Sequence, residues 1–155
     1  MALKVFISYS TLDLPIVDFV QSMLGGTTIQ VFVAQYSVTP GQPLSVPIVD
    51  AIKQCDLFLL LWSKNSKASD WVPQEIGIAK AANRKIMPVL LNSGLALPGF
   101  ISDLKYLDVP KDPRAAFTWL RDNIFAQANE KQNQEAIAWL AIGGALLWLL
   151  SKKSA

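Results

Sequence analysis

Short runs of residues that are apolar at every position alternate along this chain with segments of helical periodicity. The run from Leu57 to Trp62 is the clearest of them. A run this short is typical of a strand, and the absence of polar alternation indicates a strand covered on both faces. Three more short and mostly apolar runs are found at residues 4–8, 29–33 and 86–91. Strands that alternate with helices indicate an α/β domain with a parallel sheet.

The segments between these runs have the spacing and the end signals of helices. Asp13 precedes Pro15 as a candidate N-cap, apolar residues recur from Ile16 to Leu24, and Gly25-Gly26 ends the pattern. Further helices are predicted over 45–54, 71–83 and 113–129, and a weak fifth strand over 106–109. This order predicts a doubly wound parallel sheet of about five strands with helices on both faces.

The C-terminal segment is apolar at every position from 136 to 150 and is bounded by Glu135 and Ser151-Lys152-Lys153. As a helix it spans about 23 Å, against roughly 30 Å of hydrocarbon core. Trp139 and Trp148 lie near its ends, like interfacial anchors, and the lysines could snorkel. The sequence favours a membrane tail anchor. The alternative is a helix that packs in a core or an oligomer, because an all-apolar helix cannot face water.

We therefore divide the chain into a domain over residues 1–129, a polar linker over 130–135 and an apolar C-terminal helix over 136–151, which is either a tail anchor or an assembly helix. The formal net charge of +2 equals the charge of Lys152 and Lys153, so the rest of the chain is neutral. Without a basic run in the body, we expect no nucleic-acid partner.

Cys55 is the only cysteine, which excludes an intramolecular disulfide and fits a reducing compartment. The N-terminus shows no secretory signal, so we expect a cytoplasmic domain, held at the inner face of a membrane if the tail is an anchor. The chain contains no histidine, which excludes Ser-His-Asp triads and His-ligated metals. Glycine-rich phosphate motifs are also missing, and we predict neither a metal nor a prosthetic group.

A binding crevice in such a sheet lies beyond the carboxyl ends of the strands. Segments 8–11, 34–43 and 63–70 meet there, and the last of them leads into Trp71 and Glu75. These two residues are four positions apart and share a helix face. The less specific interpretation is a solvated early-turn glutamate, with a core tryptophan and Asp70 as the N-cap. Cys55 lies at the opposite end of the sheet and is interpreted as a buried structural thiol.

Several short motifs, taken in order, resemble the successive boxes of a TIR (Toll/interleukin-1 receptor) domain over about residues 4–125. They are Val5-Phe6-Ile7-Ser8-Tyr9-Ser10 with Asp13, the Pro40-Gly41 loop, Ser63–Ser66 and Trp71-x-x-x-Glu75. The resemblance implies a flavodoxin-like fold. Many TIR domains cleave NAD+ at the nicotinamide-ribose bond, whereas many animal adaptor members signal by assembly.

For the enzymatic members, the resemblance implies that Glu75 is catalytic and that Ser8, Tyr9, Ser10 and Trp71 bind the substrate NAD+. It also implies that the loop after the second strand, called the BB loop, mediates self-association and gates the pocket; its residues here are Tyr36, Val38, Pro40 and Gly41. The segment Leu44-Ser45-Val46-Pro47-Ile48 departs from the basic or aromatic residue that many members carry before the next helix.

The leading hypothesis is a bacterial TIR NAD+ nucleosidase or cyclase of anti-phage immunity, active on self-association. A non-enzymatic TIR scaffold tethered to a membrane is the alternative, and a receiver-like module ranks third because the acidic cluster of such modules is missing. The sequence leaves the product open among linear, cyclic and conjugated ADP-ribose.

Overall fold

The computed structural model describes residues 1–34 and 44–153, with side chains up to residue 144. Five parallel strands form one sheet in the order β2-β1-β3-β4-β5. Their bounds are β1 Leu3–Ser8, β2 Ile29–Val33, β3 Leu57–Trp62, β4 Lys85–Leu90 and β5 Leu107–Asp108. The predicted doubly wound sheet is confirmed, with the order of strands reversing between β1 and β3.

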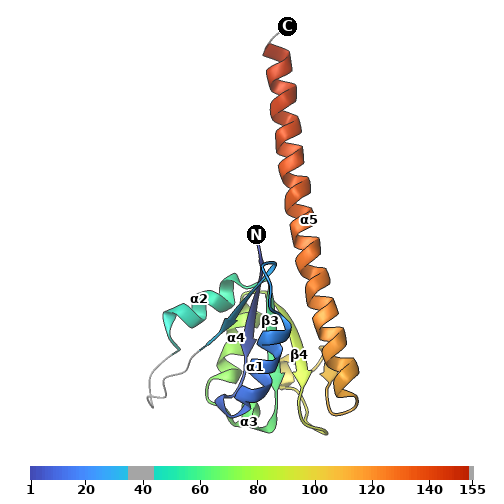
Figure 1. The fold of residues 1–155 in the computed structure, drawn as a ribbon. Coiled ribbons are helices and arrows are strands. Elements are labelled where there is room, and N and C mark those ends of the chain that lie inside the picture. The colour runs from blue at the N-terminus through green and yellow to red at the C-terminus, as the bar shows by residue number, and fades with distance from the viewer. Residues whose placement is uncertain (35–43, 154–155) are drawn as a thin grey trace.

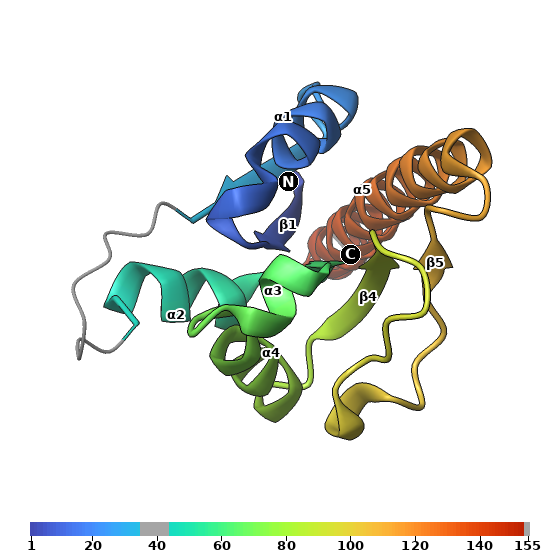
Figure 2. The same cartoon turned by 90° about the horizontal axis from the view of Figure 1, so that it is seen from below.

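Helices cover both faces of this sheet, α1 and α5 on one side and α2 and α4 on the other (Figures 1 and 2). The helices are α1 Leu14–Met23, α2 Val46–Gln54, α3 Lys64–Ala68, α4 Val72–Ala81 and α5 Pro113–Lys153, with short 3-10 turns η1 Thr11–Asp13 and η2 Gly99–Ile101. Of these, α3 was not predicted, because five residues are too few to show helical periodicity.

Two separate hydrophobic clusters result, one on each face of the sheet. Leu59 and Leu61 pack toward α1 and α5, while Phe58 and Leu60 pack toward α2 and α4. Side chains alternate between faces along a strand. Because both faces of β3 are covered, every one of its residues is buried, and this is why the run reads as apolar throughout.

One continuous helix, α5, runs from Pro113 to Lys153, so residues 130–135, which were predicted as a linker, are helical. The sequence Glu-Lys-Gln-Asn-Gln-Glu contains neither glycine nor proline, and nothing in it ends a helix. The first part of α5 packs on the sheet through Leu120, Ile124 and Ala128, all fully buried. Further along, the helix projects away from the body (Figure 1).

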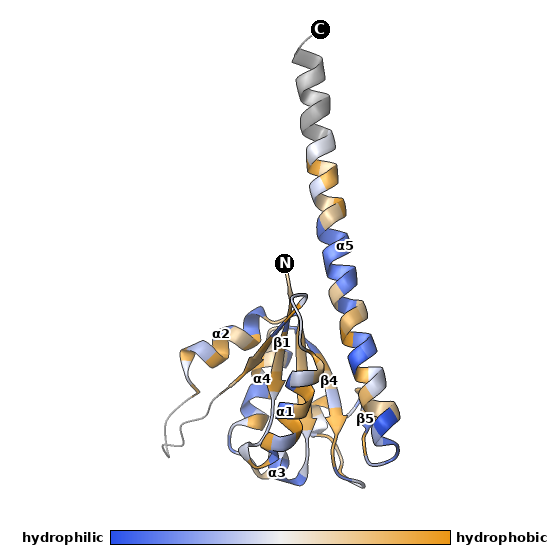
Figure 3. Cartoon of the chain, in the orientation of Figure 1, coloured by the Kyte–Doolittle hydropathy of each residue, from blue (hydrophilic) through white to orange (hydrophobic). Residues whose placement is uncertain are grey.

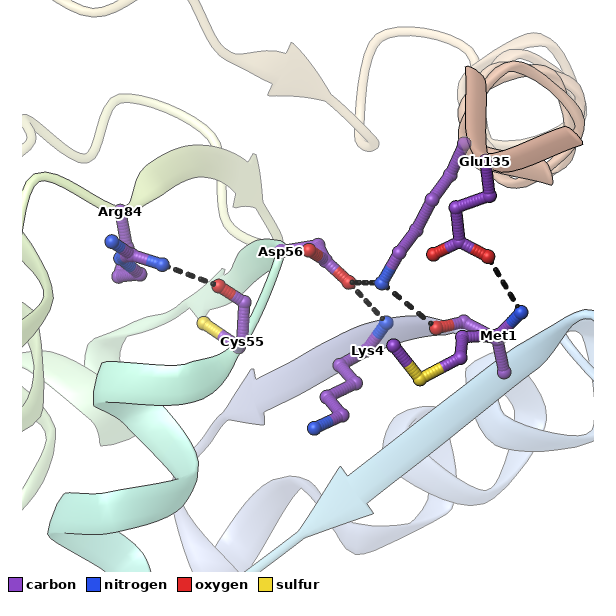
Figure 4. Close-up of polar contacts among 8 residues, drawn as sticks. Met1, Lys4, Cys55, Asp56, Arg84 and Glu135 are labelled. Atoms are coloured by element: carbon purple, nitrogen blue, oxygen red, sulfur yellow. Dashed lines mark hydrogen bonds and ion pairs between the residues drawn. The ribbon is translucent and has the colours of Figure 1, made fainter. Parts of the chain in front are cut away.

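Two ion pairs mark the place where α5 leaves the body (Figure 4). Lys131 Nζ lies 2.8 Å from Asp56 Oδ2, and the ammonium of Met1 lies 2.7 Å from Glu135 Oε2. Lys131 also donates to the carbonyl of Ala2 at 3.1 Å. These contacts hold the middle of α5 against the amino-terminal ends of β1 and β3.

A polar band on α5 is followed by apolar residues in the projecting part (Figure 3). Among the described side chains there, Ile137, Trp139, Leu140 and Ile142 are more than half exposed. Within the described residues, no helix is both long enough and apolar enough to cross a membrane. The tail anchor predicted over residues 136–151 is therefore not supported.

Candidate functional site

The site forms where β1 ends and α4 begins. Ser8 is the last residue of β1, and its Oγ donates a hydrogen bond of 2.9 Å to Oε1 of Glu75 in the first turn of α4. Neither residue is exposed to solvent. A buried carboxylate is costly unless it accepts hydrogen bonds, so this contact both stabilises Glu75 and fixes its direction. Residues 67 positions apart in sequence are thereby joined.

Tyr9 follows Ser8 and lies almost completely buried beside the same carboxylate. Its hydroxyl donates to the backbone carbonyl of Ala34, just beyond β2. Burial raises the pKa of the Tyr9 phenol, and the negative charges of Glu75 and then Asp18 raise it further. The phenol consequently stays protonated at neutral pH and acts as a donor.

Trp71 is half-buried at the N-cap position of α4, one turn before Glu75. The N-cap predicted at Asp70 is wrong, because Trp71 occupies that position and the side chain of Ser69 accepts from the first N–H groups. Ser69 Oγ accepts from the backbone N–H groups of Trp71 at 3.2 Å and of Val72 at 3.4 Å. Pro73 follows in the first turn, where a missing N–H costs nothing. Ser69 and Pro73 together fix where α4 starts and hence where Glu75 points.

Ser10 has a local role in the structure. Its Oγ accepts from the N–H of Leu12 at 3.3 Å and caps η1. The other predicted site residues, Tyr36, Val38, Pro40 and Gly41, lie outside the described residues.

A polar network that the sequence did not predict ties the loop after β1 to α3. Asp13 accepts from Ser63 Oγ at 2.5 Å through Oδ2 and from Asn65 Nδ2 at 2.8 Å through Oδ1. Asp13 does occupy the predicted N-cap position of α1, but its side chain makes no capping bond there. Ser63 and Ser66 cap α3 reciprocally. Their three-residue spacing was the available signal, because it matches a capping box.

Two open depressions among the described residues lie away from Ser8 and Glu75. One of about 550 Å³ runs along α5 beside Trp119, and another of about 560 Å³ lies between α1 and α5 beside Phe19 and Phe117. Neither is lined by Ser8 or Glu75. In this conformation the carboxylate is enclosed by protein, and a ligand must displace some of its neighbours to reach it.

Cys55 is 2% exposed at the amino-terminal end of β3, as predicted for a structural thiol. Burial is the main cause that raises the pKa of its thiol to about 11, although the charge of Arg84 acts in the opposite direction. Arg84 also donates to the Cys55 carbonyl at 3.3 Å (Figure 4). A thiol of this kind is a poor nucleophile.

Comparison with known proteins gives a family and a fold. The family model described as "TIR domain" matches residues 5–121. The TIR domain of the Toll-related receptor TRR-2 from Hydra magnipapillata is similar in structure, with a TM-score of 0.59, 24% identity, and coverage of 81% of this chain and 97% of that one.

The TIR domains of the activated Roq1 resistosome, which directly recognizes the pathogen effector XopQ, give a TM-score of 0.51 at 18% identity, covering 83% of this chain and 84% of that one. At such low sequence identities, these two structural similarities show a shared fold only. No curated protein matches the chain significantly in sequence.

Proposed function

Because this chain belongs to the TIR domain family, we propose that it is an NAD+ nucleosidase or cyclase with Glu75 as its catalytic carboxylate. The observation that carries the proposal is the hydrogen bond from Ser8 to Glu75 at the buried end of β1. It holds a carboxylate in a fixed direction at the carboxyl edge of a parallel sheet, where ligands bind in such folds.

The chemistry follows from the charge that develops during cleavage. The bond between ribose C1′ and the nicotinamide nitrogen breaks, its electron pair leaves with nicotinamide, and the ribose gains oxocarbenium character. A carboxylate beside C1′ stabilises that positive charge, more strongly in a site shielded from water. Water then adds its oxygen to C1′ and releases a proton, or a nitrogen of the adenine adds instead and closes a ring. The products are nicotinamide and ADP-ribose or a cyclic or conjugated form of it.

Neighbouring residues supply the remaining roles. Ser8 orients Glu75, Tyr9 lines the site while its hydroxyl donates to the Ala34 carbonyl, Ser10 shapes the loop below the ribose, and Trp71 forms an aromatic wall one turn from the carboxylate. NAD+ is the substrate, and the proposal includes no bound cofactor. Since NAD+ is a cytoplasmic metabolite, the body of the protein lies in the cytoplasm under this proposal.

Access to Glu75 has to be opened, because its side chain is fully buried. We attribute the opening to self-association, with Tyr36, Val38, Pro40 and Gly41 in the contact between copies. The similar Roq1 domains belong to an activated resistosome, which supports assembly as a trigger. A role in bacterial anti-phage defence completes the proposal, and it predicts that protection of infected cells requires Glu75.

The test is release of nicotinamide from NAD+ by concentrated protein, followed by chromatography. Glu75→Gln keeps the size of the side chain and an acceptor for Ser8 but removes the charge, and we expect release to be lost. Glu130→Gln, which neutralises an exposed glutamate of α5, is the matched control and should remain active. Release that survives Glu75→Gln would refute the assigned role.

The second candidate is a TIR scaffold without enzymatic activity. It is favoured by the same burial of Glu75, because a carboxylate that is 0% exposed and bonded to Ser8 also suits a structural role. If the protein is such a scaffold, assembled wild-type protein releases no nicotinamide. Glu75→Gln then lowers only the stability of the fold.

A further inference from the structure

The projecting part of α5 exposes apolar side chains that nothing in the described chain covers. Ile137, Trp139, Leu140 and Ile142 are 65%, 72%, 75% and 52% exposed. From residue 136 to 151 the sequence carries no charge. Contiguous apolar surface of this kind marks an interaction site, since its exposure to water is unfavourable.

No other part of the described chain covers this surface. The helix is unbroken from Pro113 to Lys153, and the ion pairs of Lys131 and Glu135 fix its direction where it leaves the body. Folding back would require a break in the helix. We therefore look for the partner in another molecule or in a lipid surface.

Charge at the two ends of the uncharged stretch bears on how this helix is paired. Glu130, Lys131 and Glu135 lie on the body side, whereas Lys152 and Lys153 lie at the far end. The rule for membrane spans counts lysine and arginine alone, and Arg121 and Lys131 on one side equal Lys152 and Lys153 on the other, so it favours neither orientation of a span. The same charges suit an antiparallel pair of helices, in which each acidic end lies beside the basic end of its partner.

The two adjacent glycines of this segment lie midway between the charged residues at its two ends. The midpoint between Glu135 and Lys152 falls between Gly143 and Gly144. When two copies cross there in antiparallel orientation, Glu135 lies level with the partner's Lys152, and position 140 lies level with the partner's position 147. A parallel pair would instead place like charges side by side at both ends.

Neither of the two glycines packs against another part of the described chain. A Cβ added to Gly143 or Gly144 would meet no atom within 4 Å. A glycine in a helix interior costs about 1 kcal/mol relative to alanine, so an adjacent pair is unfavourable without a compensating contact. Glycines allow two helix backbones to approach closely.

We propose that α5 pairs with α5 of a second copy in antiparallel orientation over residues 136–151, centred on Gly143 and Gly144. Leu140 lies one turn before this centre, on the same helix face as position 147. The result is a dimer with one TIR body at each end of a short two-helix rod. This inference is independent of NAD+ cleavage, so either can fail without the other.

Disulfide trapping in detergent-free buffer tests the orientation. In a Cys55→Ala background, Leu140→Cys protein is mixed with ¹⁵N-labelled Leu147→Cys protein and oxidised. Antiparallel pairing brings these positions level, so the mixed dimer should dominate. Each variant alone should cross-link poorly, because identical positions are then about 10 Å apart along the axis, too far for a disulfide. Dominant cross-linking of Leu140→Cys with itself would show a parallel pair and overturn the proposal.

Charge reversal gives a second test, in which light scattering measures the molecular mass of the full chain in solution. Wild-type protein should show twice the monomer mass of 17.0 kDa. Lys152→Glu with Lys153→Glu makes both ends acidic and should shift the mass toward the monomer, and adding Glu135→Lys should restore the dimer. A monomeric wild type, or wild type that floats with phosphatidylethanolamine–phosphatidylglycerol vesicles instead of dimerising, would also overturn the proposal.

Discussion

The hydroxyl of Ser8 is the donor on which the orientation of Glu75 depends. In Ser8→Ala the carboxylate loses this bond while buried, which should destabilise the fold by about 1–3 kcal/mol. Nicotinamide release should fall mainly through kcat, because the substrate contacts remain. Chemical denaturation and initial rates measure the two effects. Ser22→Ala is the control, since it removes a hydroxyl that donates to the Phe19 carbonyl on the exposed face of α1; equal loss of activity in both variants would contradict the orienting role.

The carboxyl group of Asp56 makes the unfolding free energy depend on pH in the acidic range. Burial alone would raise the pKa of its carboxyl, but the hydrogen bonds from Lys131 and the Lys4 N–H, together with both lysine charges, outweigh burial and hold the pKa below its ordinary 3.8. A lowered folded-state pKa contributes stability at high pH that is lost as pH falls through that pKa. The unfolding free energy of wild type minus that of Asp56→Asn should therefore be constant above about pH 5 and shrink below roughly pH 4. The unfolding free energies of wild type and Lys131→Met should likewise converge as pH falls. A difference between wild type and either variant that grows in acid would contradict the assignment.

Cys55 should resist alkylation in the folded protein. With a pKa of about 11, only about 0.1% of the thiol is ionised at pH 8, and the side chain is buried besides. Iodoacetamide followed by mass spectrometry should show modification in denaturant and none without it. Rapid modification of the native protein would mean that the amino-terminal end of β3 opens readily.

At the scale of elements, α5 is one helix with two different roles. Leu120 is fully buried on the sheet, and Leu120→Ala should cost about 2–5 kcal/mol of unfolding free energy. Leu140 is 75% exposed, so Leu140→Ala should change the stability of the monomeric body by no more than about 0.5 kcal/mol. Urea denaturation at low protein concentration compares the two. A large effect of Leu140→Ala on the monomer would show that the projecting part folds back on the body.

Periodicity predicted most of the elements because burial on both faces leaves a clear pattern. The strands from β1 to β4 and the helices α1, α2, α4 and the first part of α5 follow it. It failed over residues 130–135, where polarity suggested a connection although no residue there ends a helix. It also missed α3, whose only sequence signal is the spacing of Ser63 and Ser66.

The site was predictable only in part. The rule that carboxyl ends of parallel strands gather placed Ser8 near the helix of Glu75, and the structure brings the two together. The choice of Ser69 over Asp70 as the cap of α4 depends on local geometry that neighbouring polar residues do not reveal. The contact of Asp13 with Ser63 joins distant segments and has no local signature.

For the whole molecule, the proposed dependence on association predicts a particular response to concentration. The rate of nicotinamide release per protein molecule should rise with protein concentration, because opening of the Glu75 site requires a second copy. Deleting residues 136–155 should leave this rise in place, since the contacts between the bodies do not depend on the tail. Serial dilution of wild-type and truncated protein measures both effects. A rate per molecule independent of concentration in both would exclude activation by association.

The two hydrophobic clusters also differ in when they can form during synthesis. Every buried member of the cluster beneath α2 and α4 has been made once Ile101 is added, whereas the opposite cluster needs Leu120, Ile124 and Ala128. A nascent chain emerging from the ribosome can therefore close one face of its sheet while Val5, Ile7 and their neighbours stay uncovered. Such a half-closed intermediate exposes the surface that chaperones bind. A pause in translation shortly before α5 is the point at which aggregation of this chain would begin.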